Sequence, residues 1–454
     1  MTLRALQPAW RDRCKSSGTT GSQPRFPAVL GAAVLCCLAV GIGHGQEPTT
    51  LTLPQAREMA LRNHPQIKVA DLKALAARQV TRQARAGFFP NISANVVAVG
   101  TADDNTRLSA IGALNNPSIF DRNAEGLLIS QLITDFGRVA NLTGSARLRA
   151  EAEANNAQAS REQILLAVDG AYYGALQAQA VTRVAQQTVT ARQVFLDQVG
   201  IMASNKLRSD LDVSFARVSV EDARLLLSKA QNDLEAAFAQ LANLMGLQET
   251  KPYKLTEGTM PSQVSTNVSE FVQQALNLRP DLLSLRQQQE ASVKFARGER
   301  ALRYPTISAV GSVGVAPIHG PELDDSYAAA GLILSVPLFA GGYYSARQQE
   351  AELRAQAAEE SLRDLENNII RDVRVTWLNA QNAYERFRIS GQLLENARQS
   401  MDLAQARYNA GLSSIVEFNQ AQLNLISAQI SYATTQYEYL VQRSALSFQT
   451  GTLR

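Results

Sequence analysis

Cysteine is almost absent from this sequence of 454 residues and occurs only at Cys14, Cys36 and Cys37. A chain without cysteine after position 37 has no disulfide framework and no thiolate metal site there. Histidine is equally scarce, with three residues, and the sequence contains no His/Asp/Glu cluster, nucleophile elbow or phosphate-binding loop. These absences predict a protein that is not an enzyme and that binds neither a metal nor a cofactor.

Long apolar runs are also missing. No stretch of 18 apolar residues follows position 46, so we expect no membrane-spanning helix. Any contact with a membrane must then come from β-strands or from an interfacial helix. Five of the 44 Lys and Arg and one of the 41 Asp and Glu lie in residues 1–45, which leaves 39 basic and 40 acidic residues. Because no basic tract remains, we expect no nucleic-acid partner.

Residues 1–45 have the pattern of a signal peptide. A long basic part precedes an apolar run over residues 28–43, and small residues follow it, so the mature chain is expected to begin near Gln46. A start codon assigned too far upstream would also explain the long basic part. Lipid attachment at Cys36 or Cys37 is disfavoured, because Leu35 or Cys36 stands where a lipoprotein signal has a small residue.

The rest of the chain contains one pattern twice. The first parts of the two copies match at an offset of 215 residues: Ala60 with Ala275, Pro65 with Pro280, Pro90 with Pro305, and Ile92 with Ile307. The later parts match at an offset of 205: residues 126–137 with 331–342, Asp212 with Glu417, and Gly246 with Gly451. These preserved spacings indicate an internal duplication. We expect a first structural repeat over 46–250, an equatorial linker over 251–268 and a second repeat over 269–454.

Each repeat is expected to contain a helix, two strands joined by a loop, a very long helix, a break and a further long helix. Residues 91–98 alternate polar and apolar side chains, as a strand with one apolar face does. The longest helical pattern runs without proline from Arg138 to about Ala203. At 1.5 Å per residue such a helix would be roughly 100 Å long, too long for a domain with one compact core.

The last helix carries two apolar stripes on opposite sides. Val416, Leu423, Ile430 and Tyr437 recur at seven-residue spacing, and so do Phe418, Leu425, Tyr432 and Tyr439. Polar residues separate the stripes, so the helix would pack on two sides and meet water on the other two. A central helix of an ordinary bundle is the alternative, but the length of the long helices disfavours it. The pattern favours a helix within the wall of a tube.

Four strands per chain cannot close a barrel alone, since small barrels need about eight strands or more. Three copies would supply twelve. The sequence therefore predicts a mainly α protein with a small β part, in which long coiled-coil helices form an α-barrel and each chain contributes four strands to a trimeric, twelve-stranded transmembrane β-barrel.

The two Ala-Leu…Pro segments, the paired strands and residues 408–417 (YNAGLSSIVE), followed by a helix to Gly451, resemble the outer-membrane efflux protein family, of TolC type. The resemblance implies a homotrimer in the cell outer membrane, in contact with its lipid, with the helical part in the periplasm. It also implies an exit duct of a tripartite efflux or type I secretion system. The implied partners are a periplasmic adaptor protein and an inner-membrane transporter of RND or ABC type.

The resemblance also implies a periplasmic gate at the turn before the last helix. The residues at the gate positions are Tyr408, Gly411, Ser413, Glu417, Gln420 and, in the first repeat, Asp212. Ser413 and Gln420 stand where the family has a basic and a second acidic residue, which puts the charge-linked lock in doubt. Glu417 and Asp212 would give six carboxylates in a trimer and would favour cations. Alternatively, both are helix-capping residues after Ser414 and Ser209.

Phe88, Phe89 and Tyr304 precede the predicted strands and are candidates for an aromatic girdle at the membrane interface. Packing between the strand ends and the adjoining helices is the alternative. For the whole protein the alternative function is a secreted coiled-coil or filament protein, which would have no use for two pairs of strands at duplicated positions.

Overall fold

The computed structural model describes residues 50–99, 122–248, 253–318 and 324–453, all within one compact unit of residues 48–454. The expected signal peptide and the loop containing Asp103 and Asp104 lie outside the described residues. Within the described ranges, no helix combines the length and the apolar character needed to cross a membrane.

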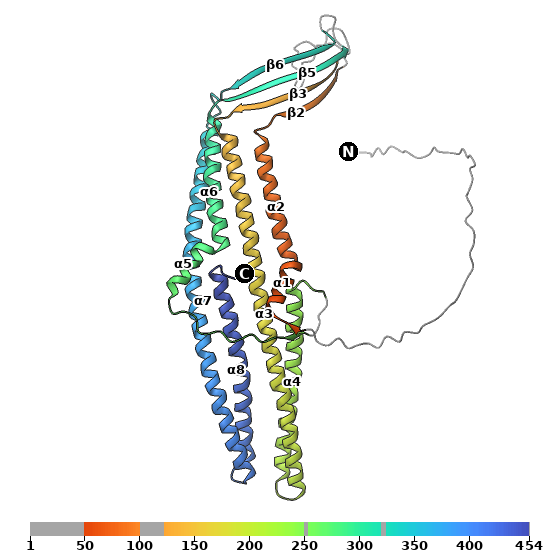
Figure 1. The fold of residues 1–454 in the computed structure, drawn as a ribbon, viewed down its shortest axis with the longest axis vertical. Helices are drawn as coiled ribbons and strands as arrows, with labels where there is room; N and C mark the ends of the chain where they lie inside the picture. The colour runs from red at the N-terminus through yellow and green to blue at the C-terminus, as the bar shows by residue number, and fades with distance from the viewer. Residues whose placement is uncertain (1–49, 100–121, 249–252, 319–323, 454) are drawn as a thin grey trace, which may run out of the picture. The chain divides into compact units, whose positions relative to one another are not determined.

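The described elements follow the duplicated order (Figure 1). The first repeat contains β1 (Thr50–Leu51), α1 (Leu53–Asn63), α2 (Pro65–Ala86), β2 (Asn91–Val99), β3 (Arg122–Thr134), α3 (Arg138–Ser204) and α4 (Asp210–Leu244). β4 (Lys254–Leu255) lies in the linker. It is followed by α5 (Val268–Leu278), α6 (Pro280–Arg300), the 3₁₀ helix η1 (Ala301–Arg303), β5 (Thr306–Ile318), β6 (Ser326–Ser335), α7 (Tyr343–Asn409) and α8 (Ile415–Gln449). Helices α3 and α7 have 67 residues each, and α4 and α8 have 35 each.

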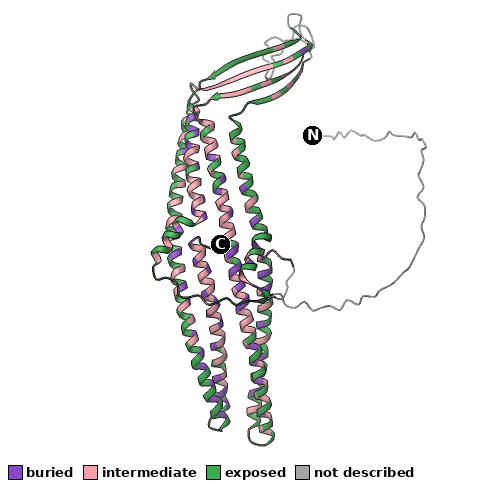
Figure 2. Ribbon diagram, in the orientation of Figure 1, coloured by how far each residue is buried: buried purple, intermediate pink, exposed green. Residues whose placement is uncertain are grey.

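The long helices pack in one succession. Near the strands, α3 lies between α2 and α6, and α6 packs against α7. Farther along, α3 and α4 form one hairpin, α7 and α8 form another, and α3 contacts α8 between them. Buried residues are thinly spread along these helices, as Figure 2 shows. The largest cluster of buried residues lies midway along α3, around Tyr172, where α1 and the short parallel pair β1–β4 cover the helix.

The four longer strands form one antiparallel sheet in the order β2-β3-β5-β6. Its register aligns apolar residues in rows across one face, for example Ile92, Ile129, Gly311 and Ala330. The opposite face carries Ser93, Asn95, Ser130 and Ser312. The apolar face is open: Val96 is 71% exposed and Leu332 is 72% exposed. The pairing of β3 with β5 shifts register twice, between Asn123 and Glu125 and between Leu132 and Thr134.

Helices α4 and α8 end in the same way, each followed by a glycine in the left-handed conformation. Gly246 and Gly451 both have positive φ, 71° and 69°. A Cβ atom on Gly246 would lie 2.9 Å from backbone atoms of Asn63, and one on Gly451 would lie 2.9 Å from the backbone of Leu278. Asn63 and Leu278 differ by the 215-residue offset, and the glycines by 205. The duplication therefore extends to tertiary contacts.

The two stripes of α8 have different neighbours. Phe418 and Tyr439 are buried, whereas Val416 is 61% exposed and Leu423 is 51% exposed. Tyr437, at the far end of the exposed stripe, packs into the central cluster on α3. Within one chain, the stripe that begins at Val416 is therefore covered mainly near its C-terminal end.

Candidate functional site

The two turns that join the paired long helices have the same conformation. We call residues 205–209 and 410–414 the tip turns. Lys206 and Gly411 are equivalent at the 205-residue offset, and their φ angles are 61° and 75°. The amide of Leu207 donates to Met202 O over 2.9 Å, and that of Leu412 donates to Arg407 O over 2.8 Å. This is the Schellman arrangement that ends helices at a left-handed residue. It leaves the side chains of Leu207 and Leu412 each 72% exposed.

Three aromatic rings pack together beside the tip turns; we call Phe195, Tyr408 and Phe418 the aromatic cluster. Phe195 comes from α3, and the other two rings come from α7 and α8. The ring centroids of Phe195 and Phe418 are 4.4 Å apart, and those of Tyr408 and Phe418 are 5.4 Å apart. Tyr408 is 2% exposed. The cluster therefore ties the first hairpin to the second at their free ends.

A basic residue does contact the tyrosine, and it comes from the other repeat. The guanidinium carbon of Arg208 lies 4.2 Å from the centroid of the Tyr408 ring, and its Nη2 donates to Tyr408 O over 2.7 Å. Arg208 stands two residues after Lys206, as Ser413 stands two after Gly411. The basic residue missing from the second tip turn is thus present at the same position of the first, and both turns contribute to one cluster.

Burial raises the pKa of the Tyr408 hydroxyl; Arg208 opposes this shift and Asp212 adds to it. The hydroxyl oxygen and Ser413 Oγ are buried without a hydrogen-bond partner in the described part of the chain. Gln420, one turn further on, is exposed and donates to Asn424 Oδ1 over 3.0 Å. Tyr408 and Ser413 thus each bury an unsatisfied hydroxyl near the tip, whereas Gln420 is exposed.

Both carboxylates expected at the gate stand beside helix N-termini. The Asp212 carboxylate accepts from Ser209 N over 3.1 Å, and Ser209 Oγ accepts from Asp212 N over 3.2 Å, which completes a capping box. Ser414 Oγ accepts from Glu417 N over 3.3 Å, but the Glu417 carboxylate pairs with Arg407 Nε at 3.3 Å. Asp212 is thus engaged in capping, whereas Glu417 remains 47% exposed with an ion-pair partner.

The candidate girdle residues lie where the helices give way to strands. Phe88, Phe89 and Tyr304 are 46%, 59% and 44% exposed. Tyr304 packs against Phe136, with ring centroids 5.8 Å apart. Phe136, which sequence reasoning missed, has a φ of 53° because Asp135 caps α3 through the amides of Gly137 and Val139. Phe339, also missed, is 91% exposed. The junction therefore carries more exposed rings than the sequence pattern indicated.

The linker between the repeats runs across the long helices as a belt. We call residues 253–267 the equatorial belt. Tyr172 Oη donates to Thr256 O over 2.9 Å, Trp377 Nε1 to Ser265 O over 2.8 Å, and Tyr439 Oη to Ser262 O over 2.6 Å. These bonds attach one segment to α3, α7 and α8. Tyr172 is also buried in the central cluster, so the belt is fixed to the best-covered part of α3.

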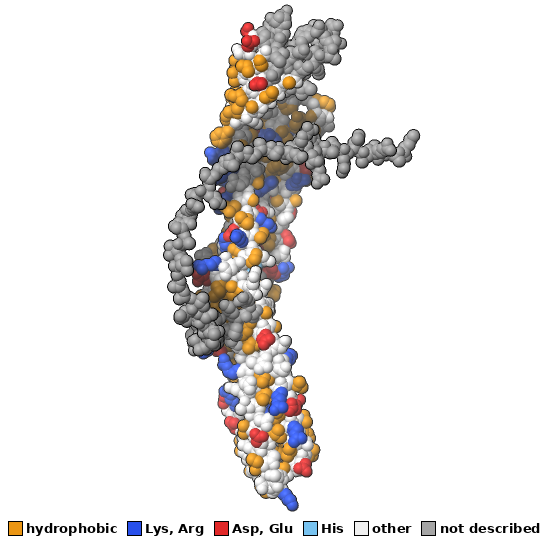
Figure 3. Space-filling view, turned by 90° about the vertical axis from the view of Figure 1, so that its right-hand side faces the viewer, with side chains coloured by type: hydrophobic (Ala, Val, Ile, Leu, Met, Phe, Trp, Pro, Cys, Tyr) orange, Lys and Arg blue, Asp and Glu red, His pale blue; other side chains and the backbone are white. Residues whose placement is uncertain are grey.

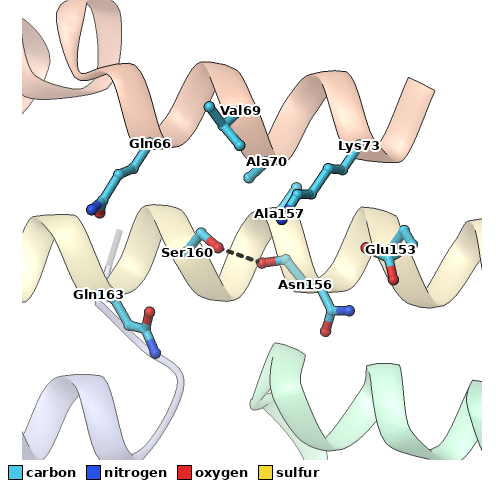
Figure 4. Close-up of a pocket in the computed structure, with 9 residues that line it drawn as sticks. All are labelled: Gln66, Val69, Ala70, Lys73, Glu153, Asn156, Ala157, Ser160 and Gln163. Carbon is cyan, nitrogen blue, oxygen red and sulfur yellow. Dashed lines mark hydrogen bonds between the residues drawn. The ribbon is translucent and has the colours of Figure 1, made fainter. Parts of the chain in front are cut away.

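A groove between α2 and α3 is lined mainly by polar side chains (Figure 4). Its lining includes Gln66, Lys73, Glu153, Asn156, Ser160 and Gln163. Ser160 Oγ donates to the carbonyl of Asn156 over 3.0 Å, so even this hydroxyl is satisfied within its own helix. The opposite face of α3 carries Tyr172 and the equatorial belt. Helix α3 thus lines a polar groove on one side and is covered by α1 and the equatorial belt on the other.

No group of three or more His, Cys, Asp and Glu within the described ranges is placed to hold a metal ion. Long hairpins with polar surfaces, joined to a sheet with one open apolar face, define the class of outer-membrane channel proteins. The chain belongs to the outer membrane efflux protein family, whose model matches residues 56–247 and 271–452. It is an outer-membrane channel of the efflux and secretion type, a transport protein and not an enzyme.

Known relatives include both efflux and secretion proteins. The outer membrane protein TolC of Escherichia coli is 22% identical over 88% of this chain and 82% of its own length. The alkaline protease secretion protein AprF of Pseudomonas aeruginosa is 25% identical over 90% of this chain and 86% of its own. The solved structure of VceC from Vibrio cholerae has a TM-score of 0.74 at 20% identity, covering 88% of this chain and 96% of that one.

Proposed function

We propose that three copies of this chain form a passive exit duct, with a twelve-stranded β-barrel in the outer membrane and a helical tube in the periplasm. The observation that carries this proposal is the open sheet. In the described residues, edge strands β2 and β6 pair on one side only, and the apolar face is uncovered. Edges and an apolar face of this kind are stable when neighbouring copies pair with them and lipid covers the face.

The tip turns would form the periplasmic gate. The aromatic cluster and Arg208 hold the two hairpins together at their free ends, so opening the tube requires these contacts to separate. The Glu417 and Asp212 carboxylates stand beside the cluster and would place six negative charges around the mouth of a trimer. This lock differs from a purely charge-linked one because stacked rings supply much of its contact.

The exposed leucines of the tip turns support an adaptor as the periplasmic partner. Leu207 and Leu412 occupy equivalent positions and leave apolar side chains at the end of each hairpin. Apolar side chains at such a position favour docking of a complementary protein surface. An adaptor protein bound there would join the duct to an inner-membrane transporter of RND or ABC type in a tripartite pump or a type I secretion system.

The experiment that tests the duct uses the full chain purified from outer membranes. A trimer that resists SDS until it is heated, together with steady single-channel conductance in planar bilayers, is the expected result. A soluble monomer without conductance would overturn the proposal. Family membership already excludes the secreted filament, and the sequences of the neighbouring transporter and adaptor genes would decide between efflux and protein secretion.

A further inference from the structure

One motif recurs in both repeats just before the sheet. Arg82, Arg85 and Phe89 stand at the end of α2, and Arg297, Arg300 and Tyr304 stand at the end of α6. Each pair of equivalent residues differs by 215 positions, the offset of the duplication in this part of the chain. Both copies therefore present two arginines one and two turns before an aromatic residue, at the junction with a strand.

The motif lies on one side of its helix. Arg82 and Arg85 follow Asp71 by 11 and 14 residues, each close to a whole number of turns of α2, and Phe89 comes three residues after the helix ends at Ala86. Asp71 pairs with Arg161 on α3 at 2.5 Å, on the α3 face that continues to Tyr172 and the equatorial belt. The polar groove contains Lys73, which is two residues from Asp71 and points to the other side of α2.

The second copy faces the same way. Arg286 is equivalent to Asp71 and pairs with Glu366 of α7 at 3.0 Å. Glu366 lies between Leu365 and Ile369, which belong to the cluster that α5 covers. Arg297 and Arg300 follow Arg286 at the same two spacings. Both motifs thus stand on the side of the wall that carries α5 and the equatorial belt. We assign this side to the outside of the proposed tube, because a belt on the inside would cross the lumen.

The four arginines are exposed, and the described residues offer them no counter-ion. None of them lies within ion-pair distance of a carboxylate in the part of the chain that the structure describes, and Arg82 bonds only the neutral Gln79 at 3.2 Å. The nearby carboxylates are already engaged, since Asp135 caps α3 and Glu299 pairs with Arg347. Lys and Arg side chains lie where the strands give way to helices, below the apolar surface of the sheet (Figure 3).

The depth of the arginines fits the headgroups of a bilayer. Arg85 and Arg82 lie one and four residues before the end of α2 at Ala86, and Arg300 and Arg297 lie in the last turn of α6, so all four stand within roughly 6 Å of a helix end. The headgroup layer of one leaflet is about 5–8 Å thick, and aromatic rings mark its boundary with the hydrocarbon. An arginine fork also matches the geometry of a phosphate group.

We propose that Arg82, Arg85, Arg297 and Arg300 form a collar that binds the phosphates of anionic phospholipids in the periplasmic leaflet. This inference rests on the proposed function, because it requires the sheet to enter the outer membrane. Three copies would place twelve guanidinium groups around the tube. Arginines near a helix C-terminus also stabilise the helix itself, so the test must separate lipid binding from that effect.

The test compares two variants of the full chain, each lacking four exposed cations. One is Arg82→Gln/Arg85→Gln/Arg297→Gln/Arg300→Gln. The matched control is Arg217→Gln/Lys229→Gln/Arg374→Gln/Arg398→Gln, whose sites lie on other helices. Trimers are delipidated, mixed with phosphatidylglycerol or phosphatidylcholine, and analysed by native mass spectrometry and thermal unfolding. We expect wild type and control to retain phosphatidylglycerol in preference to phosphatidylcholine. The collar variant should retain at least about fivefold less phosphatidylglycerol than wild type.

Equal retention by the collar variant and wild type would overturn the proposal, as would an equal loss in the control. A lower unfolding temperature of the collar variant without any change in retained lipid would assign the arginines to helix stability alone and would also overturn it. Conductance is measured separately in pure phosphatidylcholine bilayers. If wild type fails to conduct there, the duct itself fails; if both variants conduct and lipid preference is unchanged, only the collar fails.

Discussion

Lys206 and Gly411 hold the same left-handed backbone conformation in the two tip turns, although only one of them is a glycine. A side chain at positive φ costs free energy that glycine does not incur, of the order of 1 kcal/mol. The hydrogen bond from Leu207 N to Met202 O, which the second tip turn repeats from Leu412 N to Arg407 O, offsets the strain at Lys206.

We therefore expect Lys206→Gly to raise the free energy of unfolding by up to about 1 kcal/mol, since the gain at positive φ exceeds the entropy cost of glycine. Gly411→Ala should lower it by about 1 kcal/mol through the strain that it introduces. Thermal unfolding of the detergent-solubilised protein measures both. A destabilised Lys206→Gly variant would show that the lysine side chain itself supports the turn.

The aromatic cluster can be tested by removing one ring. Phe195→Ala removes the ring that α3 contributes to the cluster and should increase conductance in planar bilayers, because the two hairpins lose the ring stacking that joins them at the tips. The ring pairs contribute about 0.5–1.5 kcal/mol each beyond the area that they bury. Phe215→Ala, at a residue 40% exposed on α4, is the control and should leave conductance unchanged. Equal effects of the two substitutions would argue against a specific lock.

Arg208 gives a second test of the same lock. Arg208→Gln removes the cation over the Tyr408 ring, which contributes about 0.5–1 kcal/mol at a partly exposed site, and should raise the frequency of opening. The frequency of opening of Arg208→Lys should lie between those of wild type and Arg208→Gln, because lysine keeps the charge and loses the planar fork. Single-channel recordings distinguish these cases; identical gating in all three would place the lock elsewhere.

The carboxylates at the tips make a prediction about ions. Glu417→Gln combined with Asp212→Asn should weaken the preference for cations, measured as a reversal potential in a salt gradient, because six charges leave the mouth of the trimer. Glu221→Gln with Glu395→Gln removes the same charge from positions away from the tips and serves as the control. Unchanged selectivity in the first variant would leave these residues with capping and ion-pair roles only.

The ion pair between Arg57 of α1 and the buried Asp169 of α3 should contribute strongly to the free energy of unfolding. Arg57 Nε donates to Asp169 Oδ1 over 2.7 Å, and Asp169 is fully buried. Because the charge of Arg57 would lose its main partner, Asp169→Ala should cost about 3–5 kcal/mol. Glu221→Ala, which breaks the exposed pair with Arg224, should cost less than about 1 kcal/mol. Similar losses in denaturant unfolding would contradict the distinction.

Much of the fold follows from the sequence because the duplication gives two independent records of each element. The proline-free segment from Arg138 to about Ala203 predicts α3 to within a residue. The short pair β1–β4 was not predictable, since strands of two residues have no periodicity. Phe136 was missed for a related reason: its exposure depends on the cap at Asp135, not on an apolar pattern.

The basic residue of the candidate site comes from the other repeat than the tyrosine that it contacts. The tyrosine and the turn glycine could be located from their spacing, but the basic residue was sought only in the second repeat. Arg208 lies 200 residues before Tyr408, and its role depends on the two hairpin ends meeting in space. A comparison of the equivalent positions Ser413 and Arg208 in the two repeats locates this basic residue from the sequence.

The equal lengths of the paired helices constrain how any partner meets the tube. Because α3 matches α7 and α4 matches α8 in length, each chain has two hairpins of equal length. Three chains would present six ends around the tube, alternating between a turn with Lys206 and Arg208 and a turn with Gly411 and Ser413. Such a rim has near-sixfold shape but threefold charge, so a partner that senses shape alone could bind as six copies, whereas one that senses charge would bind as three.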